Sequence, residues 1–185
     1  LDMSEAGAAS FNGSVTVGAN LDVSSGTIKL DGNFPTGTDN VALGNAALSG
    51  GSFSGSGNIA IGDSVGDAIT SGTNAVAIGR DALGGVYTGS DAIAIGRSAL
   101  AALTIGSNNV AIGALAGTSL TEGLQNVLIG ANAGDALDDA DFNVAIGQSA
   151  LTGDTKGSRS VAIGHGALSV QNFTSATNSN NTAVG

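Results

Sequence analysis

The sequence contains no cysteine, no tryptophan and a single proline, and aromatic residues make up only 3% of its 185 residues. The absence of cysteine excludes a disulfide framework and any thiolate metal site. One proline cannot support a collagen triple helix, and the 31 glycines do not recur at every third position. The shortage of large rings means that any core is thin and built from small and β-branched side chains.

Positive charge is also scarce, because 5 Lys and Arg residues face 15 Asp and Glu residues and the net charge is −10. Such a surface cannot neutralise a row of phosphates, so we expect neither nucleic acid nor an anionic membrane as a partner. The longest apolar run extends from Ala99 to Leu103. A bilayer span needs about 18 apolar residues or more, so no membrane insertion is expected in this segment.

What the sequence does contain is a repeated Val-Ala-Ile-Gly motif with small variations. A small apolar residue and then Leu or Gly follow each motif, and a second glycine column precedes it, broken only at Ala140. The motifs recur about every 17 residues, with a longer interval before a partial last copy, and a fixed period of this length indicates a solenoid. The closing glycines are Gly44, Gly62, Gly79, Gly96, Gly113, Gly130, Gly147 and Gly164, with Gly185 closing the partial copy.

Each motif is predicted to form a short strand. A β-branched residue opens all eight complete copies, and the first and third side chains of the motif share one face. Glycine suits the tight corner that ends each strand, and Asn or Asp tolerates the same left-handed region before it. The residues in that position are Asn40, Asn58, Asp91, Asn109, Asn126 and Asn143. Two short strands and two corners are expected to make one coil.

The coils must stack, because a single coil cannot bury its own apolar edge. Equivalent residues then lie about 4.8 Å apart along the axis. We expect Val over Val and Ile over Ile to fill a dry ladder within the stack, with Ile78, Ile95 and Ile112 as mutual neighbours. The thin Ala side would admit a second layer or another chain. Since a lone stack would leave one apolar face wet, we also expect oligomerisation.

The predicted fold class is therefore all-β, a parallel β-roll or β-solenoid of about eight 17-residue coils in residues 37–168. Residues 1–36 lack the motif, and their alternating segments predict an N-terminal shaft or connector of short strands that joins the repeats near Pro35. Residues 169–185 are predicted to form a longer turn and the start of a further coil, as in a fragment of a longer chain.

The Val-Ala-Ile-Gly-x-x-Ala-Leu pattern covers Asp39 to Gly185 and resembles two families. One is the repeat region of bacteriophage tail-fibre and virion appendage proteins, where copies similar to the closing Asn-Thr-Ala-Val-Gly are common. The other is the YadA-like head of trimeric autotransporter adhesins, which runs on a shorter repeat. Both resemblances imply a parallel β-roll assembled as a homotrimeric fibre. The segment from Phe11 to Val23 looks more like a viral fibre shaft, so the tail fibre comes first.

The tail-fibre resemblance implies a structural fibre or adhesin segment at the virion surface or in another extracellular setting. It would present a receptor-binding tip and contribute to host-surface attachment. The implied partners are further copies of the chain, other fibre or virion proteins, and a cell-surface glycan or protein receptor. The alternative is an adhesin head on the bacterial cell surface. A polysaccharide-degrading appendage is a third hypothesis, supported only by the acidic balance, because glycosidases use paired carboxylates.

Few residues suggest a catalytic, cofactor-binding or metal-binding role. The stretch Gly55-Ser56-Gly57-Asn58-Ile59-Ala60 matches a dinucleotide fingerprint in its letters, but a strand is expected after it where that motif needs a helix. We therefore expect no cofactor. One inter-strand loop carries four carboxylates, for which a solvated acidic loop is the ordinary interpretation and a Ca²⁺ site the alternative. They belong to Asp135, Asp138, Asp139 and Asp141.

His165 is the only histidine and lies in a mixed polar column directly after the closing glycine, so we expect it to face solvent. Asp63 and Arg80 are successive members of that column and are expected to pair. Ser98 and Ser149 lie just beyond the corners without a nucleophile elbow around them. The sequence therefore predicts no enzyme and names no catalytic, cofactor-binding or metal-binding residue.

Overall fold

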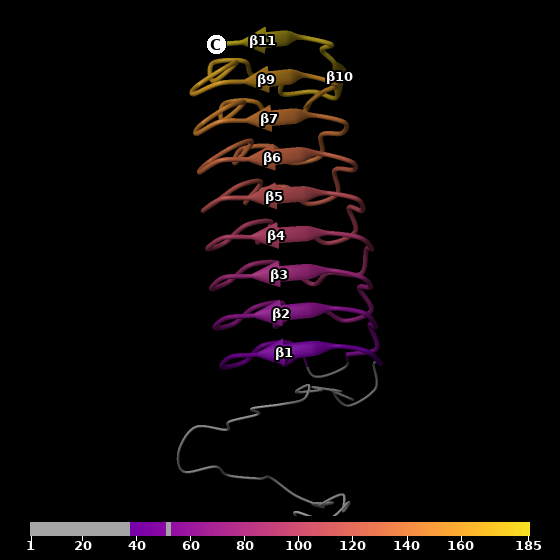
Figure 1. Ribbon diagram of the computed structural model, residues 1–185. Helices are drawn as coiled ribbons and strands as arrows, with labels where there is room; N and C mark the ends of the chain where they lie inside the picture. Colours follow the sequence, from indigo (N-terminus) through magenta and orange to yellow (C-terminus); the bar gives the residue numbers. More distant parts are fainter. Residues whose placement is uncertain (1–37, 51–52) are drawn as a thin grey trace, which may run out of the picture. The chain divides into compact units, whose positions relative to one another are not determined.

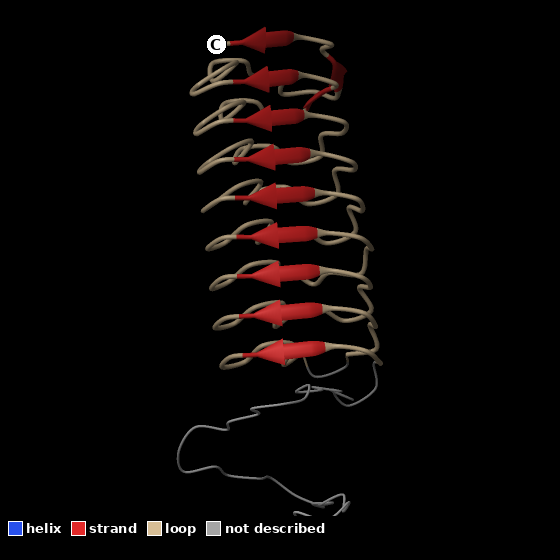
Figure 2. Cartoon of the chain, viewed as in Figure 1, coloured by secondary structure: helices blue, strands red, loops and turns tan. Residues whose placement is uncertain are grey.

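The computed structural model describes residues 38–50 and 53–185, and these residues form strands and turns without a helix (Figure 2). Nine strands make one parallel sheet in the order β1-β2-β3-β4-β5-β6-β7-β9-β11, stacked one above the next (Figure 1). They are β1 (Val41–Leu43), β2 (Ile59–Ile61), β3 (Val76–Ile78), β4 (Ile93–Ile95), β5 (Val110–Ile112), β6 (Val127–Ile129), β7 (Val144–Ile146), β9 (Val161–Ile163) and β11 (Thr182–Val184). The predicted all-β parallel solenoid of about eight coils is confirmed. The predicted shaft in residues 1–36 lies outside the described residues.

The strands pair so that each motif residue lies beside the same residue of the next repeat. Ile78 pairs with Ile95 and Ile95 with Ile112, as expected from the period. Hydrogen bonds link each coil to the next on both sides of the strand, for example from Val110 N to Asn126 O at 2.8 Å and from Gly113 N to Ile95 O at 2.7 Å. The stack is thus held along its axis by main-chain bonds that do not depend on side-chain identity.

The prediction of two strands in every coil is wrong. Beyond the main sheet, the described residues show only the short pair β8 (Gly157–Ser158) and β10 (Thr177–Asn178) and an isolated bridge between Thr73 and Ser90. The rest of each coil bends through corners, so its backbone bonds to the next coil without extended geometry. The bond from Leu83 N to Ala99 O, 3.0 Å long, is of this kind.

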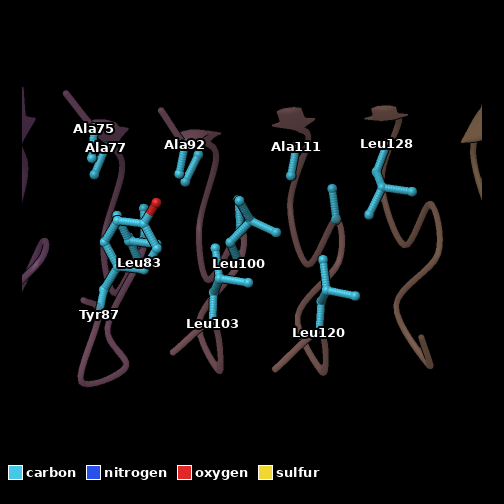
Figure 3. Close-up of a cluster of buried hydrophobic side chains, with 14 of the residues drawn as sticks. Ala75, Ala77, Leu83, Tyr87, Ala92, Leu100, Leu103, Ala111, Leu120 and Leu128 are labelled. Carbon is cyan, nitrogen blue, oxygen red and sulfur yellow. The ribbon is translucent and has the colours of Figure 1, made fainter. Parts of the chain in front are cut away.

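The assignment of the two strand faces is also reversed. The middle Ala of the motif is buried and points into the coil, whereas the Val and Ile on either side are half-buried or exposed. The interior is narrow, and leucines from the opposite wall fill it, among them Leu83, Leu100 and Leu103 (Figure 3). Only a small side chain fits on the strand side, so the larger β-branched residues lie outside.

One coil departs from the inward alanine and shows the same limit on the volume of the interior. Leu128 replaces the inward Ala in β6, and glycines stand at the Leu position of the turns that follow β5 and β6. A Cβ placed on Gly117 would lie 2.7 Å from Leu128 Cδ1, and one on Gly134 would lie 2.8 Å from Leu128 Cδ2. The extra side-chain volume on one wall is therefore matched by its removal from the other.

A ladder of buried asparagines runs beside the strands. Each lies directly before its strand and serves the next coil twice, donating its side-chain N–H to a carbonyl and accepting a backbone N–H at its side-chain oxygen. Asn126 Nδ2 donates to Ala140 O at 2.7 Å, and Asn126 Oδ1 accepts from Asn143 N at 2.9 Å. The members are Asn40, Asn58, Asn109, Asn126 and Asn143. They satisfy backbone groups that burial would otherwise leave unpaired.

The predicted reason for these asparagines is therefore wrong. The left-handed corner lies one residue earlier, as at Asn108 with φ 60°, Gln125 with φ 56° and Phe142 with φ 58°, and only Asp91 of the predicted set occupies it, with φ 59°. Side chains other than Gly, Asn and Asp also occupy such corners because the hydrogen bonds of the stack fix the backbone there. Each such residue costs about 1–2 kcal/mol, which the ladder bonds on either side offset.

The asparagine ladder is interrupted at Ala75 and Ala92, in the coils on either side of Tyr87. The Tyr87 ring is the largest fully buried side chain among the described residues, and its hydroxyl has no hydrogen-bond partner there. Burial of the ring, with a smaller contribution from the Asp91 carboxylate, raises the pKa of the Tyr87 phenol. The phenol therefore stays protonated and neutral inside the stack.

The column of buried leucines that contains Leu103, Leu120 and Leu137 ends at Asp154, which is also fully buried. Its Oδ1 accepts backbone N–H groups of Gly157 at 3.1 Å and Phe173 at 2.9 Å, and its Oδ2 accepts from the Gln171 side chain. The carboxylate thus closes the longer last turn of residues 169–181. Beyond that turn β11 pairs with β9 in the repeat register, Ala183 beside Ala162.

We expect Asn126→Ala to lower stability by about 2–4 kcal/mol, because it leaves buried backbone groups of Ala140 and Asn143 without their partners. Asn132→Ala is the matched control. Asn132 is half-exposed, and Ala46 occupies the equivalent left-handed position in the first coil. Thermal unfolding followed by circular dichroism measures both variants. Equal melting temperatures for the two would contradict a structural role of the ladder.

Gly113→Ala is expected to cost about 3 kcal/mol or more. Gly113 has φ 138°, and a Cβ there would lie 2.5 Å from both C and O of Gly130 in the next coil. Gly84→Ala serves as control, since its Cβ would approach no atom closer than 3.4 Å. Melting curves should separate the two substitutions clearly, and a Gly113→Ala protein as stable as the Gly84→Ala protein would refute the close approach of successive coils.

Candidate interaction surface

The outer side of the sheet carries two unbroken apolar columns, which together we name the Val/Ile face. In the eight strands β1 to β7 and β9, one column holds the first residue of each strand and the other the third residue. The first is Val41, Ile59, Val76, Ile93, Val110, Val127, Val144 and Val161, and the second is Leu43, Ile61, Ile78, Ile95, Ile112, Ile129, Ile146 and Ile163. Leu43 is 42% exposed and Ile112 37% exposed. The face is apolar although solvent reaches it.

The Val/Ile face is also regular. The strands point the same way along the stack (Figure 1), so the columns repeat at the spacing of a parallel sheet, about 4.8 Å. Each of the eight strands contributes one rung of three residues to the face. Eight rungs give a strip of roughly 38 Å by 10 Å, on the order of 400 Å². The largest apolar patch on a typical soluble monomer has about this size and is often functional.

Two polar columns border the Val/Ile face. The corner column lies two residues before each strand and the turn column two residues after it, so each follows one edge of the face. Around β4, Asp91 and Arg97 are exposed, Ile93 and Ile95 are half-buried, and Ala92 and Ala94 are buried. The corner column is Asp39, Gly57, Asn74, Asp91, Asn108, Gln125, Phe142 and Arg159; the turn column is Asn45, Asp63, Arg80, Arg97, Ala114, Ala131, Gln148 and His165.

The turn column does not contain the expected pair of Asp63 and Arg80. Asp63 Oδ1 instead accepts a hydrogen bond from Asn45 Nδ2 at 2.9 Å, and Arg80 Nε lies 3.7 Å from Asp81 Oδ2. Arg80 therefore pairs with Asp81, its neighbour in the sequence, and not with Asp63 on the adjacent rung. His165 is exposed, as predicted for a solvent-facing member of this column.

Three carboxylates of the acidic loop accept hydrogen bonds from different donors in neighbouring coils. Asp135 accepts a hydrogen bond from Thr152 Oγ1, and Asp141 Oδ1 accepts from Leu124 N at 2.7 Å. Asp138 accepts from Thr121 Oγ1 at 2.8 Å and lies 3.3 Å from Lys156 Nζ. These contacts, the Thr121 bond first, hold the pKa of the Asp138 carboxyl below its usual value.

The other chemical candidates occupy ordinary places in the coil. In the part of the chain that the structure describes, no three or more His, Asp or Glu side chains are grouped to hold a metal ion. Gly55 and Gly57 lie before β2, so the dinucleotide-like letters lead into a strand. Ser98 and Ser149 occupy left-handed corners, each with φ 56°. Ser98 lies four rungs from His165, and Ser149, on the neighbouring rung, makes no hydrogen bond to His165.

Comparison of the chain with protein-family models, with curated proteins and with solved structures finds no match. Among the described residues, no helix is long and apolar enough to cross a bilayer. The Val/Ile face and its two borders are thus the features from which function has to be argued.

Reasoning from the sequence found the residues of this surface but placed them inside. A signal for the correct assignment was present in the residues that flank the motif. Positions two before and two after each strand share the direction of Val and Ile, and they are polar in most repeats, with charged residues such as Asp91 and Arg97. Charges that share a direction with Val and Ile favour an outward face for both.

Calcium is expected to leave the melting temperature unchanged. Three of the four carboxylates of the acidic loop already bond to separate donors in neighbouring coils, whereas Ca²⁺ needs about six to eight oxygens around one point. A calcium titration followed by thermal unfolding measures this, with magnesium at equal ionic strength as control. A rise in melting temperature specific to calcium would contradict the expectation and restore the metal-site alternative.

Proposed function

We propose that this chain is a rigid structural segment of an extracellular fibre, a phage tail fibre or virion appendage, that assembles with copies of itself as a homotrimer. The observation that carries the proposal is the unbroken Val/Ile face on the outside of the stack. The segment would present a receptor-binding tip and contribute to attachment at the host surface, without catalysing a reaction.

Rigidity follows from how the coils are joined. Main-chain hydrogen bonds link each coil to its neighbours along the stack, and the asparagine ladder adds buried side-chain bonds between coils. Eight rungs give a rod of about 38 Å. Bending such a rod would break several of these bonds at once, which suits a part that holds a tip at a fixed distance from a particle.

Self-association follows from the exposed columns. Burying apolar surface gains about 25 cal/mol per Å², so a strip on the order of 400 Å² favours association by at most about 10 kcal/mol before the costs of ordering are subtracted. A flat array with a pitch of about 4.8 Å packs best against a surface with the same pitch. A second copy of this chain offers that surface in every rung.

A fibre segment of this kind would meet other fibre or virion proteins at its ends and a glycan or protein receptor through its tip or walls. Its place would be the virion surface or another extracellular setting. The alternative, an adhesin head on a bacterial surface, would use the same rod and the same Val/Ile face with a different anchor. The resemblance of the repeats favours the tail fibre over this alternative.

Ile112→Asp tests the proposal, because it puts a charge in the middle of the Val/Ile face without entering the core. We expect the unmodified chain to have about three times its monomer mass of 17.6 kDa in solution and the variant to dissociate. Ile105→Asp is the matched control, since Ile105 is 53% exposed and lies outside both columns. Sedimentation or light scattering gives the mass. An unmodified chain near 17.6 kDa at all concentrations would overturn the proposed assembly.

A further inference from the structure

The two borders of the Val/Ile face carry opposite charges on one rung. Asp91 lies in the corner column before β4 and Arg97 in the turn column after it, and both are exposed. The five residues from Ala92 to Gly96, which include β4, separate them, so they flank the face on opposite sides. Their charges are therefore available to a molecule that covers the face.

Arg97 is the cation without a partner in the described part of the chain. Arg80 lies 3.7 Å from Asp81, and Lys156 lies 3.3 Å from Asp138. Arg159 stacks on the Phe142 ring at 5.0 Å and donates to Asn178 Oδ1 at 3.1 Å. Asp91 accepts one long hydrogen bond, from Asn74 Nδ2 at 3.3 Å. An unpaired guanidinium beside an apolar face is suited to an anionic partner across an interface.

Symmetry decides which borders meet when two copies cover their faces. A rotation axis along the rod sets the corner column of one copy against the turn column of the next, whereas an axis across the rod sets like columns together. A closed ring allows no translation along the axis, so each rung must face the same rung of its neighbour. The rung of β4 then brings Asp91 of one copy to Arg97 of the next.

The remaining rungs agree with this arrangement. In the parallel, in-register assembly Asn74 meets Arg80, Asn108 meets Ala114, and Gln125 meets Ala131. The outer described rungs bring together Asp39 and Asn45, Gly57 and Asp63, Phe142 and Gln148, and Arg159 and His165. No rung opposes two carboxylates, and the only basic residue opposite a guanidinium is His165.

We infer that copies of this chain associate with their rods parallel and in register, and that an Asp91–Arg97 pair between neighbouring copies on the β4 rung selects this arrangement. The inference rests on the proposed self-association through the Val/Ile face. The apolar columns are alike on every rung, so they do not distinguish a closed, in-register ring from a staggered or antiparallel association. The charged pair supplies that distinction.

The repeats themselves supply the substitutions for a charge-swap test. Arg159 occupies the corner column with φ 64°, and Asp63 occupies the turn column, so Asp91→Arg and Arg97→Asp each place a residue that the column already holds. We expect each single variant to associate about tenfold more weakly or worse, because it opposes like charges. The double variant should recover assembly. Asp139→Arg, exposed and outside the borders, has the same charge change as Asp91→Arg and should assemble normally.

Mass in solution, measured against concentration for the full chain and these variants, gives the result. The Asp91–Arg97 pair is overturned if the single variants assemble normally or if the double variant does not recover assembly. The proposed self-association through the Val/Ile face still stands in that case if Ile112→Asp dissociates the assembly. An unmodified chain that remains monomeric overturns the self-association and this inference with it.

A second measurement uses the absence of native cysteine. Asp91→Cys combined with Arg97→Cys should form disulfides between copies under mild oxidation, whereas Asp91→Cys combined with Ala131→Cys, two rungs away, should not. Cross-linking in the off-rung variant would show another register, and a disulfide-linked dimer of the single Asp91→Cys variant would show an antiparallel assembly. Either result would overturn the inference.

Discussion

The pairing of each motif residue with its equivalent one repeat later is the constraint on which the rest of the structure depends. Main-chain hydrogen bonds impose it at both ends of every strand, so side chains of one column lie about 4.8 Å apart. A column then accepts only residues that tolerate a copy of themselves at that distance. Alanine does so in a narrow interior, glycine does so where backbones nearly touch, and asparagine does so by bonding to the coil that follows.

The narrow interior also explains why the protein has an apolar exterior. Leucines from the far wall fill the space opposite the strands, and the strand side has room for alanine except where Gly117 and Gly134 make room for Leu128. The β-branched residues that favour the strand must point outward. A solenoid of this width therefore carries a regular apolar face on its surface, and the proposed fibre assembly gives that face a partner of equal pitch.

The period, the strand positions and the solenoid class could be predicted from the sequence, because a fixed short spacing between the Val-Ala-Ile-Gly motifs admits few other folds. The direction of the strand faces could not be obtained from Val-Ala-Ile alone, since alternation separates two faces without saying which is inside. The corners escaped prediction for a different reason. Residues such as Leu83, Gln125 and Phe142 take positive φ because the bonds of adjacent coils hold them there, which overrides their local preference. The role of Asp154 was likewise hidden, because its donors Gly157, Gln171 and Phe173 meet it only once the last turn has closed.

The most direct measurement is a set of distances between pairs of nitroxide labels, introduced as cysteines into a chain that has none. Asp67 paired in turn with Asp135, Thr152 and Ser169 spans four, five and six rungs of one column. Dilution with unlabelled chain keeps the distances within one copy. The stacked coil predicts about 19, 24 and 29 Å, rising by one rung at each step. Distances that fail to rise in equal steps would contradict the single winding on which the face, the rod and its assembly all rest.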